Sequence, residues 1–470
     1  MPVPVINLAQ MREWERATWA TGQPEAEVIR RVGQNVAARA LTLTCSGDLL
    51  LLLAGKGHNG DDVRAAEKFL EDRKVILLNV TDPKAALAKF QSCASIPPAL
   101  IIDGLFGIGL SRALDDDWKK LIAAVNATQI PVLAVDVPSG LNADKGEHFG
   151  AAIEASVTLT VGAPKLGMLA AQAWPFVGRL EVAEGVGLIP CPHPSDLNWT
   201  LPDDFKNFPP ARPVAGHKGD FGSLVMIAGS PGFHGAAVLA ARAAQRAQPG
   251  RLMLFTDKPV YGAVAAQLQS VMVHAWKPKL KLPDSTSGIL IGPGLAAPEA
   301  AGKLSAITRR LWRDSELPMI VDASALDWLP PGEFQKNAVR VVTPHPGEAA
   351  RLLKTSAQKV QSDRVKSLHE ISRRLGNCWV VLKGHQTLVG RSQGEIFVNP
   401  SGNPHLAQGG SGDVLAGFIA GLLAQPGLQA DAGKTIRYAV WQHGAAADTL
   451  QAHQPNWIIE DLAGKIGNAR

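Results

Sequence analysis

The stretch NPHLAQGGSGDVLAG, residues 403–417, decides how the second half of this chain folds. A turn rich in Gly and Ser ends in Asp413 and runs into an apolar segment with helical spacing, 414–423. Unpaired backbone N–H groups and the helix dipole at such a start can hold a phosphate. A carboxylate there suits a general base beside a transferring phosphoryl group. The alternative is an ordinary helix start with Asp in its first turn, so the rest of the chain decides.

Length and composition indicate a globular protein of two or three domains. The chain has 470 residues, of which 46% are hydrophobic and 19% charged. Its formal charge of +5 comes without a basic block, so we expect no nucleic-acid partner, whereas an anionic small substrate remains compatible. We expect no membrane segment, because no apolar run is long enough to span a bilayer. The scattered cysteines predict reduced thiols in a cytoplasmic protein; they are Cys45, Cys93, Cys191 and Cys378.

The first half alternates between apolar runs and helical segments. Residues 49–53 form a continuous apolar run, typical of a buried parallel strand, and the Gly-rich GKGHNGDDV (55–63) follows at once. Strand, Gly-rich turn and helix in this order predict a Rossmann-like doubly wound sheet. Further strands are predicted at 75–80, 100–103, 131–137, 158–161 and 180–182, and helices at 8–43 with a break at 22–24, at 64–72, 83–91 and 116–126.

Polar side chains follow three of these strands. They are Asn59 with Asp62, Asp103, and Asp136 with Ser139. The carboxyl ends of parallel strands form the ligand crevice of such a sheet. Carboxylate, amide and hydroxyl oxygens suit a hard cation. Each Asp alone is better explained as the cap of a turn, but the three together predict a site.

Residues 8–185 resemble the NAD(P)H-hydrate epimerase domain. The resemblance rests on GKGHNGDDV, on DGLFGIGLSR (103–112) and on VDVPSGLN (135–142). It implies a K⁺ ion at Asn59, Asp103 and Ser139, and Asp136 is our candidate for proton handling. The implied substrate contacts are His58, Asn59, Gly60, Asp61, Asp62, Gly107, Ile108, Gly109, Leu110, Ser111, Arg112 and Asp136.

The first loop departs from the family pattern. His58 stands where the family has Asn, and Asp61 and Val63 stand where it has Gly. A side chain at 61 is expected to narrow the pocket or to conflict with a positive φ. These departures keep open the alternative that this domain is a non-catalytic ligand-binding module.

A Pro-rich stretch without periodicity separates the halves. It runs GLIPCPHPSDLNWTLPDDFKNFPPARPVA from 187 to 215. We therefore predict an N-terminal domain at 1–190, a linker at 191–215 and a second, larger domain at 216–470.

The second half predicts another α/β domain whose strand-end loops carry the polar residues. Two prolines hold His345 in a loop after one strand, and Lys383 ends another. The strands are predicted near 223–228, 251–255, 271–274, 288–291, 319–322, 339–343, 378–382 and 395–398. The loops read GSPGFHGAA (229–237), IGPGL (291–295), VDASAL (321–326), TPHPGE (343–348) and KGHQT (383–387).

Residues 217–465 resemble the ribokinase-like NAD(P)H-hydrate dehydratase domain. The motifs HKGDFG (217–222), IGPGL, TPHPGE, KGHQT and GGSGD occur in the family's order, and TPHPGE together with GGSGD distinguishes it from sugar and vitamin kinases. The family has Asp where Ser324 stands. The resemblance implies that Ala237, Gly294 and His345 contact the hydrated dinucleotide and that Asp413 acts at its reacting hydroxyl. The implied adenine-nucleotide contacts are Lys383, Gly384, His385, Gln386, Thr387, Gly410, Ser411 and Gly412.

Together the domains are similar to bifunctional NAD(P)H-hydrate repair enzymes. This resemblance implies epimerisation of the R and S hydrates of NADH and NADPH, and nucleotide-dependent dehydration of the S hydrate. It further implies Mg²⁺, ADP or ATP as phosphoryl donor, and a homo-oligomer. The alternative is a ribokinase-like vitamin or small-molecule kinase with a non-catalytic N-terminal module, which would release a phosphorylated product.

Overall fold

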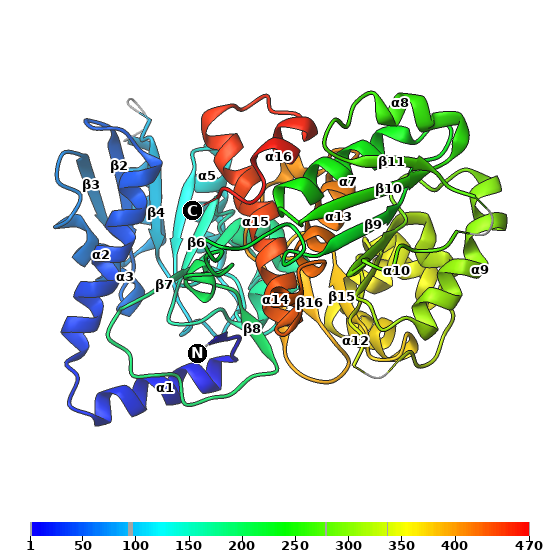
Figure 1. The fold of residues 1–470 in the computed structure, drawn as a ribbon. Coiled ribbons are helices and arrows are strands. Elements are labelled where there is room, and N and C mark those ends of the chain that lie inside the picture. Colours follow the sequence, from blue (N-terminus) through cyan, green and yellow to red (C-terminus); the bar gives the residue numbers. More distant parts are fainter. Residues whose placement is uncertain (1, 93–96, 278–279, 336, 470) are drawn as a thin grey trace. The chain divides into compact units, whose positions relative to one another are not determined.

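The chain forms two compact units in the computed structural model (Figure 1). One extends from residue 3 to 199 and the other from residue 200 onwards; we call them the N-terminal and the C-terminal unit. The division falls inside the segment predicted as a linker, which contains the short strand β8 (Leu197–Trp199). Strand β8 pairs antiparallel with β1 (Val3–Pro4). The structure describes residues 2–92, 97–277, 280–335 and 337–469.

The N-terminal unit contains a six-stranded, all-parallel sheet in the order β3-β2-β4-β5-β6-β7. This order confirms the predicted doubly wound domain. The connections of β2 and β4 leave in opposite directions, so a ligand crevice is expected between their carboxyl ends. The strands are β2 (Leu49–Ala54), β3 (Lys74–Asn79), β4 (Leu100–Gly104), β5 (Val132–Val135), β6 (Val157–Val161) and β7 (Arg179–Ala183).

Helices cover both faces of this sheet because β2 is apolar on both sides. Leu50 and Leu52 share one core cluster with α2 and α3, whereas Leu51 and Leu53 share another with α4 and α5. The helices are α1 (Leu8–Ala20), α2 (Glu25–Leu43), α3 (His58–Glu67), α4 (Pro83–Ser92), α5 (Asp116–Ala127) and α6 (Trp174–Val177).

Helix α3 begins six residues before the predicted start at 64, and it ends at Glu67 rather than at 72. Gly57 has extended backbone and is the N-cap, so the Gly-rich turn becomes the first turn of the helix. Asp61 lies in that turn and is absent from the residues with positive φ. The side chain at 61 therefore brings no backbone strain.

The C-terminal unit has the strand order β17-β16-β15-β14-β13-β12-β9-β10-β11. Strands β9 to β15 run parallel to their neighbours, and β15, β16 and β17 pair antiparallel. The three-residue strand β16 was not predicted. The strands are β9 (Ser223–Ile227), β10 (Arg251–Thr256), β11 (Met272–Ala275), β12 (Gly288–Ile291), β13 (Met319–Val321), β14 (Arg340–Val342), β15 (Trp379–Leu382), β16 (Leu388–Gly390) and β17 (Ile396–Val398).

Helix α13 is buried in the core of the C-terminal unit. It packs between α7 and α15, and all its residues from Val414 to Leu423 are buried. The helices are α7 (His234–Arg246), α8 (Tyr261–Ala265), α9 (Pro298–Asp314), α10 (Pro346–Leu353), α11 (Ala357–Ser362), α12 (Arg364–Arg374), α13 (Ser411–Leu423), α14 (Pro426–Gln429), α15 (Ala432–His453) and α16 (Ile459–Lys465).

A single methyl group on α13 is expected to separate it from α7. A Cβ at Gly417 would lie 2.1 Å from the carbonyl oxygen of Ala240. We expect Gly417→Ala to lower the free energy of unfolding by about 3 kcal/mol, because the two backbones must move apart. Urea denaturation measures this change. Gly302→Ala is the control, since that glycine of α9 faces open space and alanine there should stabilise by about 0.5–1 kcal/mol; equal effects of the two substitutions would refute the close packing.

Among the described residues, no helix is both long and apolar enough to cross a bilayer. Cys45, Cys191 and Cys378 are free, whereas Cys93 lies outside the described residues.

Candidate active sites

Five loops at the carboxyl ends of the parallel strands meet in the C-terminal unit. The loop after β9 is tied to the loop after β12, since Gly229 N–H donates to Pro293 O (2.9 Å) and Ser230 Oγ donates to Gly294 O (2.6 Å). Gly292 has a φ of +135°, and a Cβ there would lie 1.9 Å from Asp322 O. Glycine is thus needed to bring the loops after β12 and β13 together.

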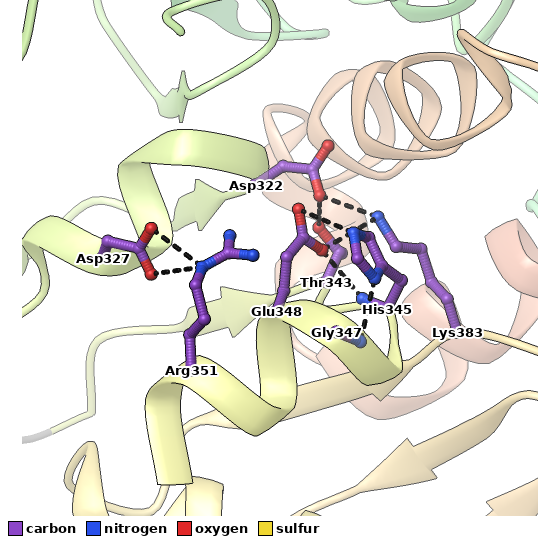
Figure 2. Close-up of polar contacts among 8 residues, drawn as sticks. All are labelled: Asp322, Asp327, Thr343, His345, Gly347, Glu348, Arg351 and Lys383. Carbon is purple, nitrogen blue, oxygen red and sulfur yellow. Dashed lines mark hydrogen bonds and ion pairs between the residues drawn. The ribbon is translucent and has the colours of Figure 1, made fainter. Parts of the chain in front are cut away.

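Asp322, at the end of β13, is the centre of a buried polar cluster (Figure 2). Its side chain accepts hydrogen bonds from Thr343 Oγ1 (2.6 Å) and Lys383 Nζ (3.1 Å). Lys383 Nζ also lies 3.8 Å from Glu348 Oε2. These residues come from β13, β14, β15 and the start of α10, so the sheet edge assembles the cluster. Lys383 was predicted as a nucleotide contact, but Asp322 and Glu348 were quoted in their motifs without a role.

His345 lies before α10, as its flanking prolines predicted. Its ring Nδ1 accepts a hydrogen bond from Gly347 N–H (3.0 Å), and the backbone N–H of His345 donates to Glu348 Oε2 (2.8 Å). This reciprocal capping fixes the imidazole at the helix start. Because Nδ1 is an acceptor, the neutral ring carries its proton on Nε2, 3.6 Å from Glu348 Oε1. Figure 2 also shows Arg351, which pairs with Asp327 instead of joining the cluster.

The first turn of α13 faces the same cluster. Gly410 is the N-cap, with a φ of +95°. A Cβ on Gly412 would lie 3.0 Å from Lys383 Nζ and 4.0 Å from Asp322 Oδ2. Burial and the charge of Asp322 raise the pKa of Asp413 to about 7, although Lys383 opposes the shift. The structure therefore places Asp413 and the cationic Lys383 at one helix N-terminus.

Two residues that sequence reasoning missed support residues 383–387 and the start of α13. The guanidinium of Arg364 lies behind residues 383–387 and donates to the carbonyl oxygens of Leu382 (3.0 Å) and Gln386 (3.1 Å). Nε2 of the buried His443 of α15 lies 3.1 Å from Ser411 O. Burial lowers the pKa of this imidazole to about 4, which favours its neutral form. Neither belongs to a motif, and no local sequence signal could have identified them.

The predicted substrate contacts of this unit differ in exposure. Ala237 is fully buried against the Gly229 turn, so its side chain does not reach solvent. Gly294 packs against Phe233 O, and the ring of Phe233 is 48% exposed. The exposed Phe233 is an apolar surface that the sequence analysis did not single out.

In the N-terminal unit, the predicted K⁺ ligands converge on one peptide group. Phe106 O accepts hydrogen bonds from Asn59 Nδ2 (2.8 Å) and Ser139 Oγ (3.2 Å). Ser139 Oγ also donates to Asp103 Oδ1 (2.7 Å). Asp103 is completely buried, which raises its pKa to about 6, and its described partners are neutral donors. A buried carboxylate without a cationic neighbour fits a bound monovalent cation.

Asp136 forms a buried ion pair that the sequence did not predict. Its Oδ1 lies 2.5 Å from Lys165 Nζ, and Lys165 is inaccessible to solvent. Asp136 has a φ of +61°, a conformation that Asp tolerates better than most residues. Lys165 lies in a segment to which we assigned no motif.

The other predicted substrate residues divide into buried and exposed groups. Asn59, Gly60 and Asp62 are buried, and Gly107 packs against Asn59, where a Cβ would lie 3.1 Å from Asn59 Cγ. His58 and Asp61 are more exposed. His58 Nε2 lies 2.9 Å from Glu25 Oε1, and Arg64 Nη2 lies 2.8 Å from Asp61 Oδ1. At the far end of the predicted loop, Gly109, Ser111 and Arg112 are exposed, and Ile108 and Leu110 are partly buried.

Among the described residues, no group of three His, Cys, Asp or Glu side chains is arranged to hold a metal ion. Within the described residues, neither candidate site therefore has three such side chains placed to bind one metal ion. A cation in either must also use amide, hydroxyl, carbonyl or ligand oxygens.

Comparisons with known proteins agree with this geometry. The NAD(P)H-hydrate dehydratase family matches residues 224–467, and the family described as the YjeF-related protein N-terminus matches residues 65–167. The bifunctional NAD(P)H-hydrate repair enzyme Nnr of Gloeobacter violaceus is 35% identical, over 95% of this chain and 94% of its own length. The same-named enzyme of Coxiella burnetii is 33% identical over 93% of each chain.

A ribokinase-like superfamily protein of Enterococcus faecalis is a structural neighbour. It has a TM-score of 0.51 and 27% identity, and the match covers 58% of this chain and 95% of that one. It confirms the ribokinase-like fold of the C-terminal unit. The match of residues 224–467 to the NAD(P)H-hydrate dehydratase family favours a dehydratase over a vitamin or small-molecule kinase. The chain belongs to the family of bifunctional NAD(P)H-hydrate repair enzymes.

Proposed function

We propose that the C-terminal unit converts the S hydrate of NADH or NADPH back to the reduced dinucleotide, with ADP or ATP as phosphoryl donor. The N-terminal unit interconverts the R and S hydrates, so that both are consumed. The observation that carries the dehydratase assignment is the meeting of Asp413 and Lys383 at the start of α13. A base, a cation and a helix N-terminus are the parts that phosphoryl transfer to a hydroxyl requires.

Asp413 has the properties of the base. Hydroxide is a poor leaving group, so the C6 hydroxyl of the hydrated ring is phosphorylated before it leaves. Asp413 removes the hydroxyl proton as the oxygen attacks the terminal phosphorus. The bond between that phosphorus and the bridging oxygen of the nucleotide breaks, and AMP leaves from ADP or ADP leaves from ATP. A pKa of about 7 suits this role, because the group is partly ionised at neutral pH and still a good proton acceptor. The ring nitrogen's electron pair then expels phosphate, and loss of a proton restores the reduced ring.

Lys383 and the N–H groups of α13 stabilise the transferring group. Negative charge grows on the phosphoryl oxygens, and fixed donors in a water-poor site act strongly on it. Asp322 and Thr343 hold Lys383 and its loop in place. Mg²⁺, which neutralises nucleotide phosphates when bound, usually takes one or two protein carboxylates. Glu348 would supply one, since its carboxylate faces the cluster 3.8 Å from Lys383.

The K⁺ site of the N-terminal unit is part of this proposal. Asn59, Ser139 and Asp103 would hold the ion together with the Phe106 carbonyl. Its charge would offset the buried carboxylate of Asp103, which the described neighbours leave without a cation.

We expect K⁺ to stabilise the protein. At a hundredfold excess over its Kd, K⁺ should raise the free energy of unfolding by about 2.7 kcal/mol, because it binds the folded state only. Scanning calorimetry in KCl and in choline chloride of equal ionic strength measures the difference. Asp103→Asn keeps the shape of the side chain and should remove the K⁺ effect; an equal K⁺ effect in this variant would contradict the site.

One assay tests the whole proposal. Purified S hydrate is incubated with the full chain and either ADP or ATP, and reduced nicotinamide absorbance and free phosphate are followed together. We expect both to rise in equal amounts with at least one nucleotide. A phosphorylated dinucleotide without free phosphate would instead indicate a kinase.

A further inference from the structure

Four ionisable side chains lie near one another in the N-terminal unit, each from a different segment. Glu15 comes from α1, Asp62 from α3, Asp136 follows β5, and Lys165 follows β6. The charge of Asp136 raises the pKa of both Asp62 and Glu15, which shows that the three carboxyls share one electrostatic environment. The inference below rests on the proposed epimerase function and assigns the proton transfers within it.

Lys165 orients Asp136. The ammonium group is buried and donates to Asp136 Oδ1 (2.5 Å), Thr160 Oγ1 (2.9 Å) and Val161 O (3.0 Å). Asp136 Oδ1 also accepts from Val161 N–H (3.0 Å) and Thr160 Oγ1 (3.2 Å). Among the described residues, no donor contacts Oδ2. Asp136 Oδ1 is therefore fully hydrogen-bonded, whereas Oδ2 is available to a ligand.

Asp62 has the opposite environment. Its side chain is 7% exposed, and among the described residues it has neither a hydrogen-bond partner nor an ion pair. Burial first, and then the charges of Asp136, Asp61 and Glu15, raise its pKa well above the usual range. A buried carboxyl without a donor is held as the neutral acid. Two neighbouring carboxyls thus differ in environment, since Asp136 pairs with a cation whereas Asp62 is buried without a donor, and such differences are how active sites separate an acid from a base.

We propose that Asp136, oriented by Lys165, and Asp62 are the base and the acid of hydrate epimerisation, which proceeds by reversible opening of the hydrated ring. The C6 carbon bears both a hydroxyl group and the ring nitrogen N1. Such a carbon can exchange its configuration without any oxidant or reductant.

The ring opens and closes through an aldehyde intermediate, and both protons return to the residues from which they came. Asp136 takes the proton of the C6 hydroxyl, the oxygen electrons form a C=O bond, and the C6–N1 bond breaks with its electron pair on N1. Asp62 then gives its proton to N1, which leaves an aldehyde and an N–H group. Rotation about the C5–C6 single bond presents the other carbonyl face. N1 attacks that face, its proton returns to Asp62, and the oxygen recovers its proton from Asp136.

The other charged groups around the pair affect its pH range. Glu15 of α1 faces both Asp136 and Lys165, and burial followed by the charge of Asp136 raises its pKa. Three further charged residues have more exposed side chains; they are His58 and Asp61 of α3 and Glu25 of α2. Epimerisation requires Asp62 to be protonated, so the rate falls as the pH rises and Asp62 loses its proton.

The experiment uses the full chain and pure R hydrate without nucleotide, so that the dehydratase cannot consume the product. We expect Asp62→Asn to lower kcat for R-to-S conversion about 100-fold and to remove the falling limb of the pH profile. Glu67→Gln, on the exposed side of the same helix, is the matched control and should leave the rate unchanged. Dehydration of S hydrate by the same preparation verifies that each variant is folded.

Lys165 is tested as a positioning residue. Lys165→Met should lower kcat about 100-fold while KM for the R hydrate stays within about threefold, because the side chain orients the Asp136 carboxylate and does not bind the substrate. Lys165→Arg retains the charge and the donor and should restore most of kcat. Lys119→Met, which removes the exposed partner of Asp116, is the control.

The outcomes separate the inference from the proposed function. Failure of the unaltered chain to convert R to S hydrate would refute the proposed epimerase function itself. An active chain whose Asp62→Asn variant retains more than half the rate and the falling limb of the pH profile would overturn the acid assignment alone. In H₂¹⁸O, ring opening predicts that newly formed S hydrate keeps its oxygen beyond the enzyme-free exchange. One ¹⁸O gained at each conversion would refute ring opening.

Discussion

Asp413→Asn is expected to lower kcat for dehydration about 10³-fold while nucleotide affinity stays within about threefold. The amide keeps the size of the side chain but cannot accept the hydroxyl proton, and loss of a general base typically reduces the rate by 10²–10⁴-fold. In the proposed site the N–H groups of α13 and Lys383 hold the nucleotide, and the substitution leaves both in place. Single-turnover kinetics and calorimetric nucleotide titration measure the two effects.

The pH dependence provides a second test of the same residue. Burial and the charge of Asp322 raise the pKa of Asp413 to about 7. The base must be ionised, so kcat/KM should rise with pH through about 7 and level off above it. The residual activity of Asp413→Asn should lack this limb. Asp431→Asn is the matched control, because Asp431 also stands at a helix start but only caps α15, a role that Asn fills equally well.

Lys383→Met is expected to lower the stability of the protein strongly. Lys383 is the cation that contacts Asp322 and Glu348, and methionine would leave these buried carboxylates unopposed. Removing one partner of a buried ion pair commonly costs about 3–5 kcal/mol, and we expect a loss near 3 kcal/mol because the Lys383 side chain is 18% exposed. Urea denaturation at pH 7.5 measures it, with the exposed Lys359→Met as control.

The same substitution should change catalysis in a defined direction. Lys383 lowers the pKa of Asp413, so its removal should move the rising limb of kcat/KM above pH 7. Nucleotide affinity should fall about 10–100-fold, since a charge-assisted contact to phosphate is lost. A variant with unchanged stability and an unmoved limb would show that Lys383 does not couple the three carboxylates.

The motifs predicted the loops of both sites but not the contacts between them. GGSGD predicted the helix start of α13, and KGHQT predicted Lys383 at a strand end, because both signals are local. The contact between Lys383 and Asp322 joins residues 61 positions apart. Lys165 pairs with Asp136 across 29 positions and belongs to no quoted motif. Only the strand order brings these pairs together.

The same distinction explains the errors in secondary structure. The start of α3 was misplaced because glycines that signal a loop also permit a helical first turn after Gly57. Strand β16 was missed because three residues carry too little pattern, and its hairpin with β15 is stabilised by pairing rather than by composition.

The sequence alone determined the two α/β domains, the family and the loops that carry the chemistry. Buried parallel strands are continuous apolar runs, and Gly, Pro and Asp mark their ends, so these features are written locally. The tertiary structure decided which carboxylates are paired, which are isolated and which have a raised pKa. Those properties depend on burial and on charges contributed by distant segments, and only the folded chain brings such segments within a few ångströms.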